Sequence, residues 1–232
     1  MERASIARGP ERDRYRFVAP IYDLATAAWS GGAIWRTRHR AVSACRSRDR
    51  VLIPGAGTAR AAVEAARAGA DVVALERSPS MFERARRRIA RAGARVDLRP
   101  IPLADLDPAE RFDVVVAEHF LNVFPPALMR ATRDDLLGRL RPGGWFAVAD
   151  FAPLAGGRLG IARSMQRLHH VLPLGGCALL TGNAMHPIYD HGAELARDDR
   201  VELRATFDAR SFGIGPRWFR TWVWRRTGAT TA

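Results

Sequence analysis

The sequence lacks lysine altogether and has only two cysteines, Cys45 and Cys177. The two cysteines are far apart and match no metal-ligand or redox spacing, so the sequence predicts neither a disulfide framework nor a zinc site. The longest nearly unbroken apolar run, residues 171–180, is too short to cross a bilayer, and residues 1–16 are charged rather than apolar. We therefore expect no membrane-spanning segment, no signal peptide and a reducing compartment, the cytoplasm.

Because lysine is absent, all 37 basic residues are arginine, and the formal net charge is +13. A strongly basic surface attracts RNA, anionic lipid headgroups or acidic substrates through long-range fields that salt weakens. The densest cluster has no aromatic side chain between its members, whereas single-stranded nucleic-acid sites usually stack bases on aromatic rings. Its members are Arg84, Arg86, Arg87, Arg88 and Arg91. The pattern argues against a nucleic-acid partner and leaves open a solvated surface or peripheral contact with an anionic membrane.

The middle of the chain predicts one α/β unit. A length of 232 residues and a hydrophobic content of 47% suit a single domain that buries a substantial core. From residue 49 onward, short apolar runs alternate with amphipathic segments, a pattern typical of helices around a parallel sheet. We expect strands at 51–53, 72–76, 96–99, 112–117 and 145–151, helices at 58–68, 79–92 and 126–140, and a turn at Arg141-Pro142-Gly143-Gly144 that ends the last helix.

Two further regions flank this alternating pattern. Residues 15–47 predict two aromatic-rich helices broken at Gly31-Gly32, so we expect residues 1–48 to form a helical cap or lid. An insertion at about 155–198, with a helix at 159–172 and irregular chain at 173–191, is expected to shape an acceptor site. Residues 201–207 and 218–224 predict an antiparallel hairpin. The predicted fold is a Rossmann-like, seven-stranded, mostly parallel sheet with that C-terminal hairpin, in a domain at residues 49–232.

The strongest functional signal is the run from Val51 to Ala59, a strand that leads into Gly55-Ala56-Gly57 and then a helix. Glycines there remove Cβ atoms, so the backbone can turn sharply and approach a nucleotide-like ligand. The second strand ends at Glu76, about twenty positions later, where a carboxylate in this fold can accept hydrogen bonds from both ribose hydroxyls. Alone, the loop fits a tight turn and Glu76 fits a surface pair with Arg77. Together they favour a nucleoside site.

The spacing of the glycines separates two kinds of nucleoside. A dinucleotide fingerprint needs a third glycine at position 60, so that the helix N-terminus can hold a pyrophosphate. This chain has Arg60 there. The shorter Gly-x-Gly form suits a ligand without phosphate whose amino-acid end lies by the loop, which favours S-adenosylmethionine over NAD.

Further stretches resemble a known family. Val18-Ala19-Pro20-Ile21-Tyr22-Asp23-Leu24, Ser30-Gly31 and Trp35-Arg36 are similar to the N-terminal signature of the ubiquinone and menaquinone biosynthesis C-methyltransferases. Residues 121–124 and 140–145, with Asp150-Phe151, resemble that family's segments after strands four and five, and bacterial phosphatidylethanolamine N-methyltransferases share much of the pattern. The resemblance covers about residues 15–153 and implies a class I S-adenosylmethionine-dependent methyltransferase. The chain departs from the family at Ile53 or Pro54, where an Asp is usual, and at Ala59 and Arg60.

The resemblance also implies where the cofactor lies. The loop after the third strand usually contacts the adenine, here through Asp105 or its neighbours, although Asp105 also fits a capping role. Glu118 would position the sulfonium end or orient His119. The expected cofactor-binding residues are Gly55, Ala56, Gly57, Glu76, Arg77, Met81, Ala104, Asp105, Leu106 and Glu118.

Two side chains are candidates for catalysis. Methyl transfer from a sulfonium is an in-line displacement, so holding the acceptor at attack distance in a dry pocket matters most, and a base is optional. Histidine is the usual base near neutral pH, and His119 directly follows the fourth strand at the edge where ligands bind. His119 also fits a packing role. Tyr22 is the second candidate, because ring faces attract a sulfonium, although it also fits an aromatic core.

The sequence determines the acceptor-binding residues less well than the cofactor-binding residues. Its candidates are Tyr15, Asn122, Asn183, His186 and Tyr189. The cluster around His186 and Tyr189 matches no known metal spacing, so we expect no metal.

The sequence thus predicts methyl transfer from S-adenosylmethionine to a small-molecule acceptor, in a biosynthetic pathway. It leaves open a membrane-surface quinone or phospholipid methyltransferase, an RNA methyltransferase, an NAD-dependent oxidoreductase and a non-catalytic nucleoside-binding module. The pattern indicates neither the acceptor nor the oligomeric state.

Overall fold

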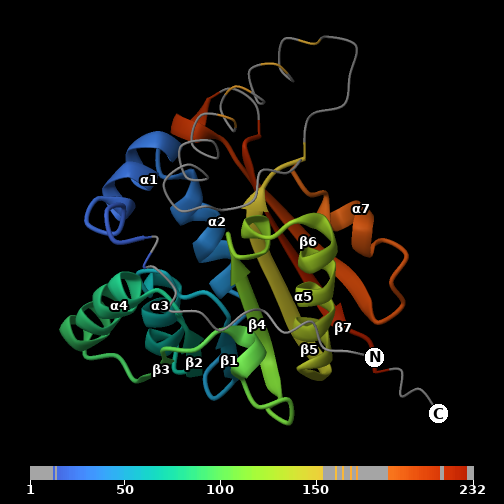
Figure 1. Ribbon diagram of the computed structural model, residues 1–232. Coiled ribbons are helices and arrows are strands. Elements are labelled where there is room, and N and C mark those ends of the chain that lie inside the picture. The colour runs from blue at the N-terminus through green and yellow to red at the C-terminus, as the bar shows by residue number, and fades with distance from the viewer. Residues whose placement is uncertain are drawn as a thin grey trace.

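The computed structural model describes residues 13, 15–153, 160, 164, 168, 171, 188–214 and 217–228. A seven-stranded sheet runs through them in the order β3-β2-β1-β4-β5-β7-β6 (Figure 1). All neighbouring pairs from β3 to β5 are parallel, and β7 is antiparallel to both β5 and β6. The strands are β1 (Arg50–Ile53), β2 (Asp71–Leu75), β3 (Val96–Arg99), β4 (Phe112–Glu118), β5 (Leu140–Phe151), β6 (Val201–Ala209) and β7 (Phe219–Arg226). The predicted fold class is confirmed.

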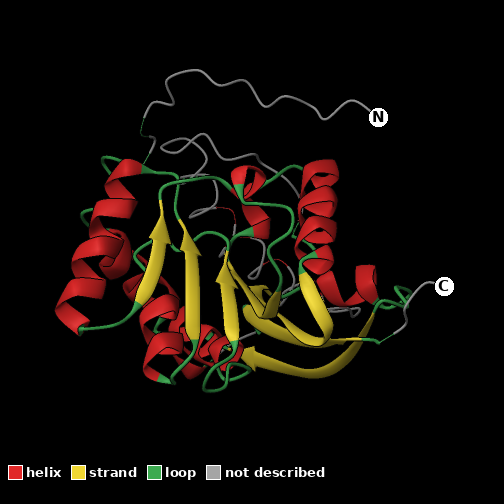
Figure 2. Cartoon of the chain, turned by 90° about the horizontal axis from the view of Figure 1, so that it is seen from below, coloured by secondary structure: helices red, strands yellow, loops and turns green. Residues whose placement is uncertain are grey.

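Helices flank the sheet on both faces (Figure 2). They are α1 (Tyr22–Ser30), α2 (Ala33–Val42), α3 (Arg60–Arg67), α4 (Pro79–Ala92), α5 (Pro126–Gly138) and α7 (His191–Leu195), with short 3₁₀ turns η1 (Leu103–Asp105), η2 (Leu121–Val123) and η3 (Ser211–Gly213). Residues of α2, α3 and α4 belong to the core on one face, and residues of α5 and α7 to the core on the other. The central strands are therefore buried on both sides, which explains their apolar runs.

The two faces of the sheet are packed with side chains of different size. Ala62 and Ala65 of α3 lie with Val51 and Val114 on one face, where small residues let the helices approach the strands closely. The other face holds large side chains, among them Phe112, Leu136, Trp222 and Trp224. Each fully buried aromatic or leucine side chain contributes about 1.5–3 kcal/mol through burial. This face is therefore the larger hydrophobic contributor to stability.

The break between the first two helices lies where the glycine pair predicts it. Gly31 and Gly32 have φ angles of 54° and 78°, a region that favours glycine. A Cβ on Gly31 would lie 2.4 Å from the backbone nitrogen of Phe212, so the tight approach of η3 also requires glycine. The break lets α2 pack on the sheet while α1 lies toward its carboxyl edge. The division into a cap at 1–48 and a domain at 49–232 stays a prediction.

The predicted turn at residues 141–144 is wrong. β5 already begins at Leu140, opposite Phe112, and the next aligned pair is Val114 with Trp145. A single residue of β4 thus stands opposite four residues of β5, so the Arg-Pro-Gly-Gly segment is an irregularity within a strand. Gly144 is required there because its Cβ would lie 2.8 Å from the carbonyl oxygen of Asp113.

Most of the predicted helix at 159–172 and irregular stretch at 173–191 lies outside the described residues. Among the helices that are described, none combines the length and apolar character needed to cross a membrane.

Candidate functional site

The glycine loop and Glu76 meet at the carboxyl ends of β1 and β2. Gly57 has a left-handed backbone with a φ of 54°, and no heavy atom lies within 4 Å of the position of its missing Cβ. Its backbone N–H donates to Glu76 Oε2 at 2.8 Å, and the Ser78 N–H donates to Oε1 at 2.8 Å. Burial raises the pKa of Glu76, while these backbone donors and the charge of Arg77 oppose that shift. The loop therefore offers open backbone beside a partly buried acceptor.

The other expected cofactor-binding residues line the neighbouring strand tips. The Glu76 N–H donates to Arg99 of β3 at 3.1 Å, which brings η1 beside β2. Within η1 and just after it, Ala104 and Asp105 are exposed and Leu106 is buried. Gly55 and Ala56 lie in the loop itself, Arg77 is exposed, and Met81 is buried in the first turn of α4. These predicted residues thus lie at or just after the carboxyl ends of β1, β2 and β3.

Asp13 anchors the N-terminal chain beside this edge. Its carboxylate accepts from the Ser80 N–H at 3.0 Å and from the Ser78 hydroxyl at 2.9 Å, at the start of α4. Burial raises the pKa of Asp13, but these donors outweigh burial and hold it below its usual value. Tyr15 follows, half-buried. The sequence analysis did not identify Asp13, because the partners lie 65 or more positions away.

Asp23 joins α1 to the cofactor loop. The hydroxyl of Thr58 donates to its carboxylate at 2.8 Å, and the guanidinium groups of Arg88 and Arg60 lie 2.6 and 3.2 Å away. Burial raises the pKa of Asp23, but the two arginines and Thr58 outweigh that effect and lower it. The carboxylate is therefore charged at neutral pH and ties three separate elements together.

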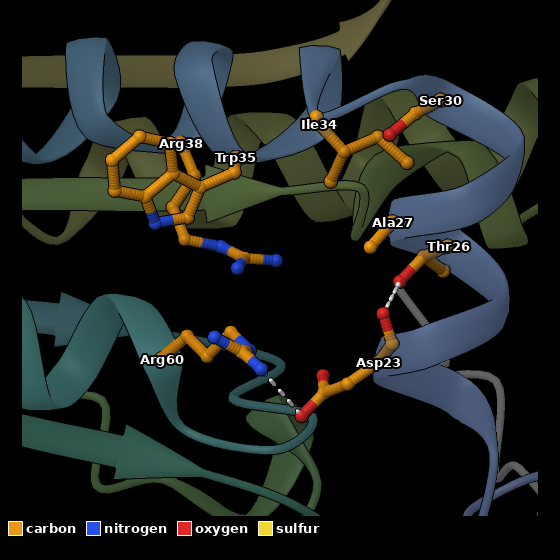
Figure 3. Close-up of a pocket in the computed structure, with 9 residues that line it drawn as sticks. Asp23, Thr26, Ala27, Ser30, Ile34, Trp35, Arg38 and Arg60 are labelled. Atoms are coloured by element: carbon orange, nitrogen blue, oxygen red, sulfur yellow. Dashed lines mark hydrogen bonds and ion pairs between the residues drawn. The ribbon is translucent and has the colours of Figure 1, made fainter.

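A pocket of about 250 Å³ lies between α1, α2 and the start of α3 (Figure 3). In Figure 3 the guanidinium groups of Arg38 and Arg60 point into the same space, with Asp23 on the opposite wall. Arg38 also forms an ion pair with Glu118, at the tip of β4, and both side chains are only 12% exposed. The Ser30 hydroxyl lines the pocket, and it is buried without a partner among the described residues. The pocket thus presents both charge signs and an unsatisfied hydroxyl.

His119 follows Glu118 in a left-handed conformation, with a φ of 46°. Its Nδ1 lies 3.4 Å from Asn122 Nδ2 and 3.7 Å from Asp150 Oδ1. The ring packs edge-on against Phe151 and Phe219. Burial lowers the pKa of His119 more than the charges of Asp150 and Glu118 raise it. The imidazole is therefore neutral at physiological pH.

Asp150, near the end of β5, is 3% exposed. It accepts hydrogen bonds from Asn122 Nδ2 at 2.6 Å, the Phe151 N–H at 2.8 Å and His191 Nε2 at 3.2 Å. Burial raises the pKa of Asp150, but its hydrogen bond and charge interactions with His191, together with His119 and Phe151, lower it overall. Asp150 is thus a buried carboxylate linked to both imidazoles.

Of the remaining predicted residues, Tyr22 lies near the pocket and Tyr189 lies in the core. Tyr22 begins α1, half-buried, and interacts electrostatically with Arg38. Tyr189 is buried in the core beside α5, where its hydroxyl donates to the carbonyl oxygen of Phe124 at 2.7 Å, and burial raises its pKa to about 12. Asn183 and His186 lie outside the described residues.

The structure also places four residues at this edge that the sequence did not assign to a site, Asp23, Arg38, Arg60 and Asp150. His191, which lies there too, belongs to the cluster around His186 and Tyr189 that the sequence proposed for the acceptor. Two of the four residues could have been selected from the sequence. Asp23 belongs to the quoted Tyr22-Asp23 motif, and Asp150 stands near the end of a predicted strand, as Glu76 does. Arg38 could not have been selected, because Glu118 lies 80 positions away in a chain with 37 arginines.

Comparison with known proteins gives consistent results. A family model described as "Methyltransferase domain" matches residues 51–144. The demethylmenaquinone methyltransferase of Parafrankia sp. (strain EAN1pec) is 34% identical over 178 residues, covering 66% of this chain and 67% of the relative. That of Clavibacter sepedonicus is 32% identical over 158 residues, covering 66% of this chain and 63% of the relative. The match thus spans less than two thirds of the Clavibacter protein.

A solved structure shares the fold. The Burkholderia thailandensis 1,6-didemethyltoxoflavin-N1-methyltransferase, with bound 1,6-didemethyltoxoflavin and S-adenosylhomocysteine, is 17% identical and has a TM-score of 0.60. The alignment covers 96% of this chain and 93% of that one. At this identity the likeness is evidence for the fold alone.

We predict that Asp23→Asn lowers the free energy of unfolding by about 1–2 kcal/mol at neutral pH, because two arginines and Thr58 lose a charged acceptor. The folded-state pKa of Asp23 is depressed, so its contribution is present above the unfolded pKa, near 3.8, and is lost as pH falls below it. Urea unfolding of both proteins should therefore show a difference that is constant above about pH 5 and shrinks in acid. Asp97→Asn, in an exposed pair with Arg99, should cost less than about 1 kcal/mol. A pH-independent difference would contradict the prediction.

Proposed function

Because the chain belongs to the class I S-adenosylmethionine-dependent methyltransferases, we propose that it transfers the cofactor's methyl group to a small-molecule acceptor, as part of a biosynthetic pathway. The observation that carries this proposal is the open Gly57 backbone beside the Glu76 carboxylate. A diol can donate two hydrogen bonds to one carboxylate, and the missing Cβ leaves room for the sugar beside it.

The adenosyl part of the cofactor fits the edge formed by the first three strands. In this proposal Glu76 accepts from the ribose hydroxyls, and the chain at Ala104, Asp105 and Leu106 lies against the adenine. Gly55 and Ala56 bring the backbone close, with Met81 beneath and Arg77 at the rim. The cofactor supplies an electrophilic methyl group on a sulfonium, and these residues fix its direction.

The amino-acid end of the cofactor fits the charged pocket. A free amino acid carries one carboxylate and one ammonium group. Arg38 and Arg60 in the pocket lining offer donors for the carboxylate. Asp23 in the lining, and Glu118 behind its ion pair with Arg38, offer acceptors for the ammonium. Charge-assisted hydrogen bonds of this kind contribute about 1.5–3 kcal/mol each. The pocket therefore suits a zwitterion better than a phosphate, which would oppose the two carboxylates.

The acceptor is proposed to lie over the tips of β4 and β5. His119 and Asn122 stand there, and Tyr22 would close the site from α1 and exclude water. Tyr15, Asn183, His186 and Tyr189 stay predicted acceptor contacts. The two relatives compared above, 34% and 32% identical, are named for demethylmenaquinone, which supports a small-molecule acceptor over RNA.

We also propose the cytoplasm as the compartment. Cys45 is a free, buried thiol, and burial raises its pKa to about 12. Such a thiol is protonated and unreactive at neutral pH. It fits a reducing environment and serves as a small apolar core residue.

A second candidate is a methyltransferase that works at a membrane surface, as a quinone or phospholipid enzyme would. It is favoured by the outer face of α1 and the turn before it, where Phe17, Ile21 and Leu24 are 81%, 58% and 73% exposed. Within α1 the polar side chains of Asp23 and Ser30 point inward and Leu24 is exposed, while Trp29 packs inward against Phe151 and Phe219. An apolar face on a chain of net charge +13 suits peripheral contact with anionic lipid.

Glu76→Gln should weaken binding of S-adenosylhomocysteine about tenfold, because the carboxylate's charge-assisted hydrogen bonds to the ribose are lost. Isothermal titration calorimetry measures this directly. Glu83→Gln, an exposed change on α4, serves as the matched control and should leave the affinity unchanged. The absence of any binding to the unchanged protein would end the proposal, and equal affinity of Glu76→Gln would reject the role of Glu76.

For the membrane candidate, Leu24→Glu should reduce binding to vesicles that contain anionic lipid, because it places a negative charge in the apolar face. Leu203→Glu is the matched control: Leu203 is exposed but pairs with Trp224, at the opposite end of the sheet. Vesicle pelleting should rise with anionic lipid content and fall with salt. Equal pelleting of the two variants, or none by the unchanged protein, would reject this candidate.

A further inference from the structure

We propose that His119 acts on the acceptor as a hydrogen-bond donor through Nε2–H, and that Asn122, Asp150 and His191 are positioning residues that hold it in that tautomer. The inference rests on the proposed function for the nature of the reaction. It departs from the sequence-based expectation of a base at His119, and it rests on the order of contacts along one buried polar network.

Asp150 is the central acceptor of this network. A buried carboxylate requires donors around it, and the three groups bonded to it are the amide of Asn122, the N–H of Phe151 and the imidazole of His191. Among the described residues, none of its hydrogen-bond or ion-pair partners is an arginine, although the chain has 37 of them. Because a charged carboxylate only accepts hydrogen bonds, the Asn122 atom that contacts Asp150 is the amide nitrogen.

Asn122 links Asp150 to His119. The Asn122 Nδ2 atom that donates to Asp150 also lies 3.4 Å from His119 Nδ1, within hydrogen-bond distance, whereas Asp150 Oδ1 lies 3.7 Å from that ring nitrogen, beyond it. A proton on Nδ1 would face the N–H groups of Asn122, so in this inference Nδ1 accepts and the ring proton stays on Nε2. His119 Nε2 is buried and has no partner among the described residues. A buried N–H with no acceptor carries a desolvation cost, which an oxygen of a bound acceptor molecule would relieve.

His191, at the start of α7, anchors the network. Its Nε2 lies 3.2 Å from Asp150 Oδ2 and must donate, because the carboxylate is charged. Its ring is held by Tyr189 on one side and edge-on by Trp222 on the other. Both histidines therefore carry a proton on Nε2. His191 donates this N–H to Asp150, whereas the N–H of His119 has no acceptor among the described residues.

The backbone supports the placement of His119. A non-glycine residue with positive φ is strained, and such strain concentrates at functional sites. The His119 N–H donates to Ala149 of β5 at 2.8 Å, and the preceding Glu118 is held by Arg38. The ring is thereby fixed at the edge where β4 and β5 end, next to the pocket proposed for the cofactor's amino-acid end. Burial lowers the pKa of His119, so the donor is a neutral imidazole.

This arrangement indicates the chemistry of the acceptor. A neutral N–H donor stabilises an oxygen that carries negative charge at or near the reacting atom, as in an enolate or a phenolate. Such an acceptor loses its proton to solvent and binds as the anion. Its electron pair forms the new bond to the methyl carbon, the carbon–sulfur bond breaks with its pair on sulfur, and His119 keeps its proton throughout.

The tautomers are measured by ¹⁵N nuclear magnetic resonance of histidine-labelled protein, free and with S-adenosylhomocysteine. At neutral pH we expect a protonated Nε2 and a bare Nδ1 at His119, and a protonated Nε2 at His191. Asn122→Leu should turn His119 into a mixture of tautomers and leave His191 unchanged. A predominantly Nδ1–H tautomer at His119 in the unchanged protein would overturn the inference. Because the free protein gives the same readout, a failure of cofactor binding remains a separate result.

A substitution series tests the donor role. Glutamine keeps an N–H donor near the Nε2 position but takes no proton at neutral pH, whereas leucine has neither property. With 4-nitrophenolate as the probe and S-adenosylhomocysteine present, we expect His119→Gln to bind within about threefold of the unchanged protein. His119→Leu should bind about tenfold more weakly, the loss expected for one hydrogen bond to a charged group.

Both substitutions place a side chain at the same positive φ, so the backbone strain is matched, and thermal unfolding checks that each variant folds. Equal loss in the glutamine and leucine variants would overturn the donor role. Failure of 4-nitrophenolate to bind the unchanged protein in its cofactor-product complex would overturn the oxyanion preference. If His119→Leu does not fold, the resonance measurement on the unchanged protein still decides the tautomer.

Discussion

The account depends on one contact, the hydrogen bond from the Gly57 backbone to the Glu76 carboxylate. It joins the ends of two parallel strands through a left-handed backbone at Gly57, which favours glycine, and a partly buried acid at Glu76. Neither feature serves the core, because both groups stand at the edge of the sheet where the burial of apolar side chains ends. Two backbone N–H groups offset part of the desolvation cost of this carboxylate, and in the proposed function the ribose hydroxyls offset more of it.

The N-terminal helices complete this edge from the other side. Asp23 ties α1 to the glycine loop and to α4, and Arg38 ties α2 to the tip of β4. These ion pairs hold Asp23 of α1 inward, while the neighbouring Leu24 is exposed. The same charges thus line the pocket and fix the orientation of α1. At the far end of the same edge, Asp150 organises a second polar group around the tips of β4 and β5.

Local signals in the sequence were sufficient to predict the sheet and its flanking helices, and to select Gly57 and Glu76, which the structure brings together. Apolar periodicity, the helix break at Gly31 and the Gly55 loop depend on nearby residues, so they can be recognised without a structure. The irregularity in β5 could not be predicted, because the Pro-Gly-Gly pattern resembles a turn and only the register with Asp113 shows that it lies within a strand. The partners of Arg38 and Asp150 were equally hidden, since they are 80 and 41 positions away in the chain.

A crystal structure of the complex with S-adenosylhomocysteine tests the central claim most directly. The account predicts ribose hydroxyls within hydrogen-bond distance of the Glu76 carboxylate, and the amino-acid end between Arg60 and Glu118. A ligand found elsewhere, or a sugar that does not contact Glu76 because the Gly57 N–H still occupies the carboxylate, would contradict it.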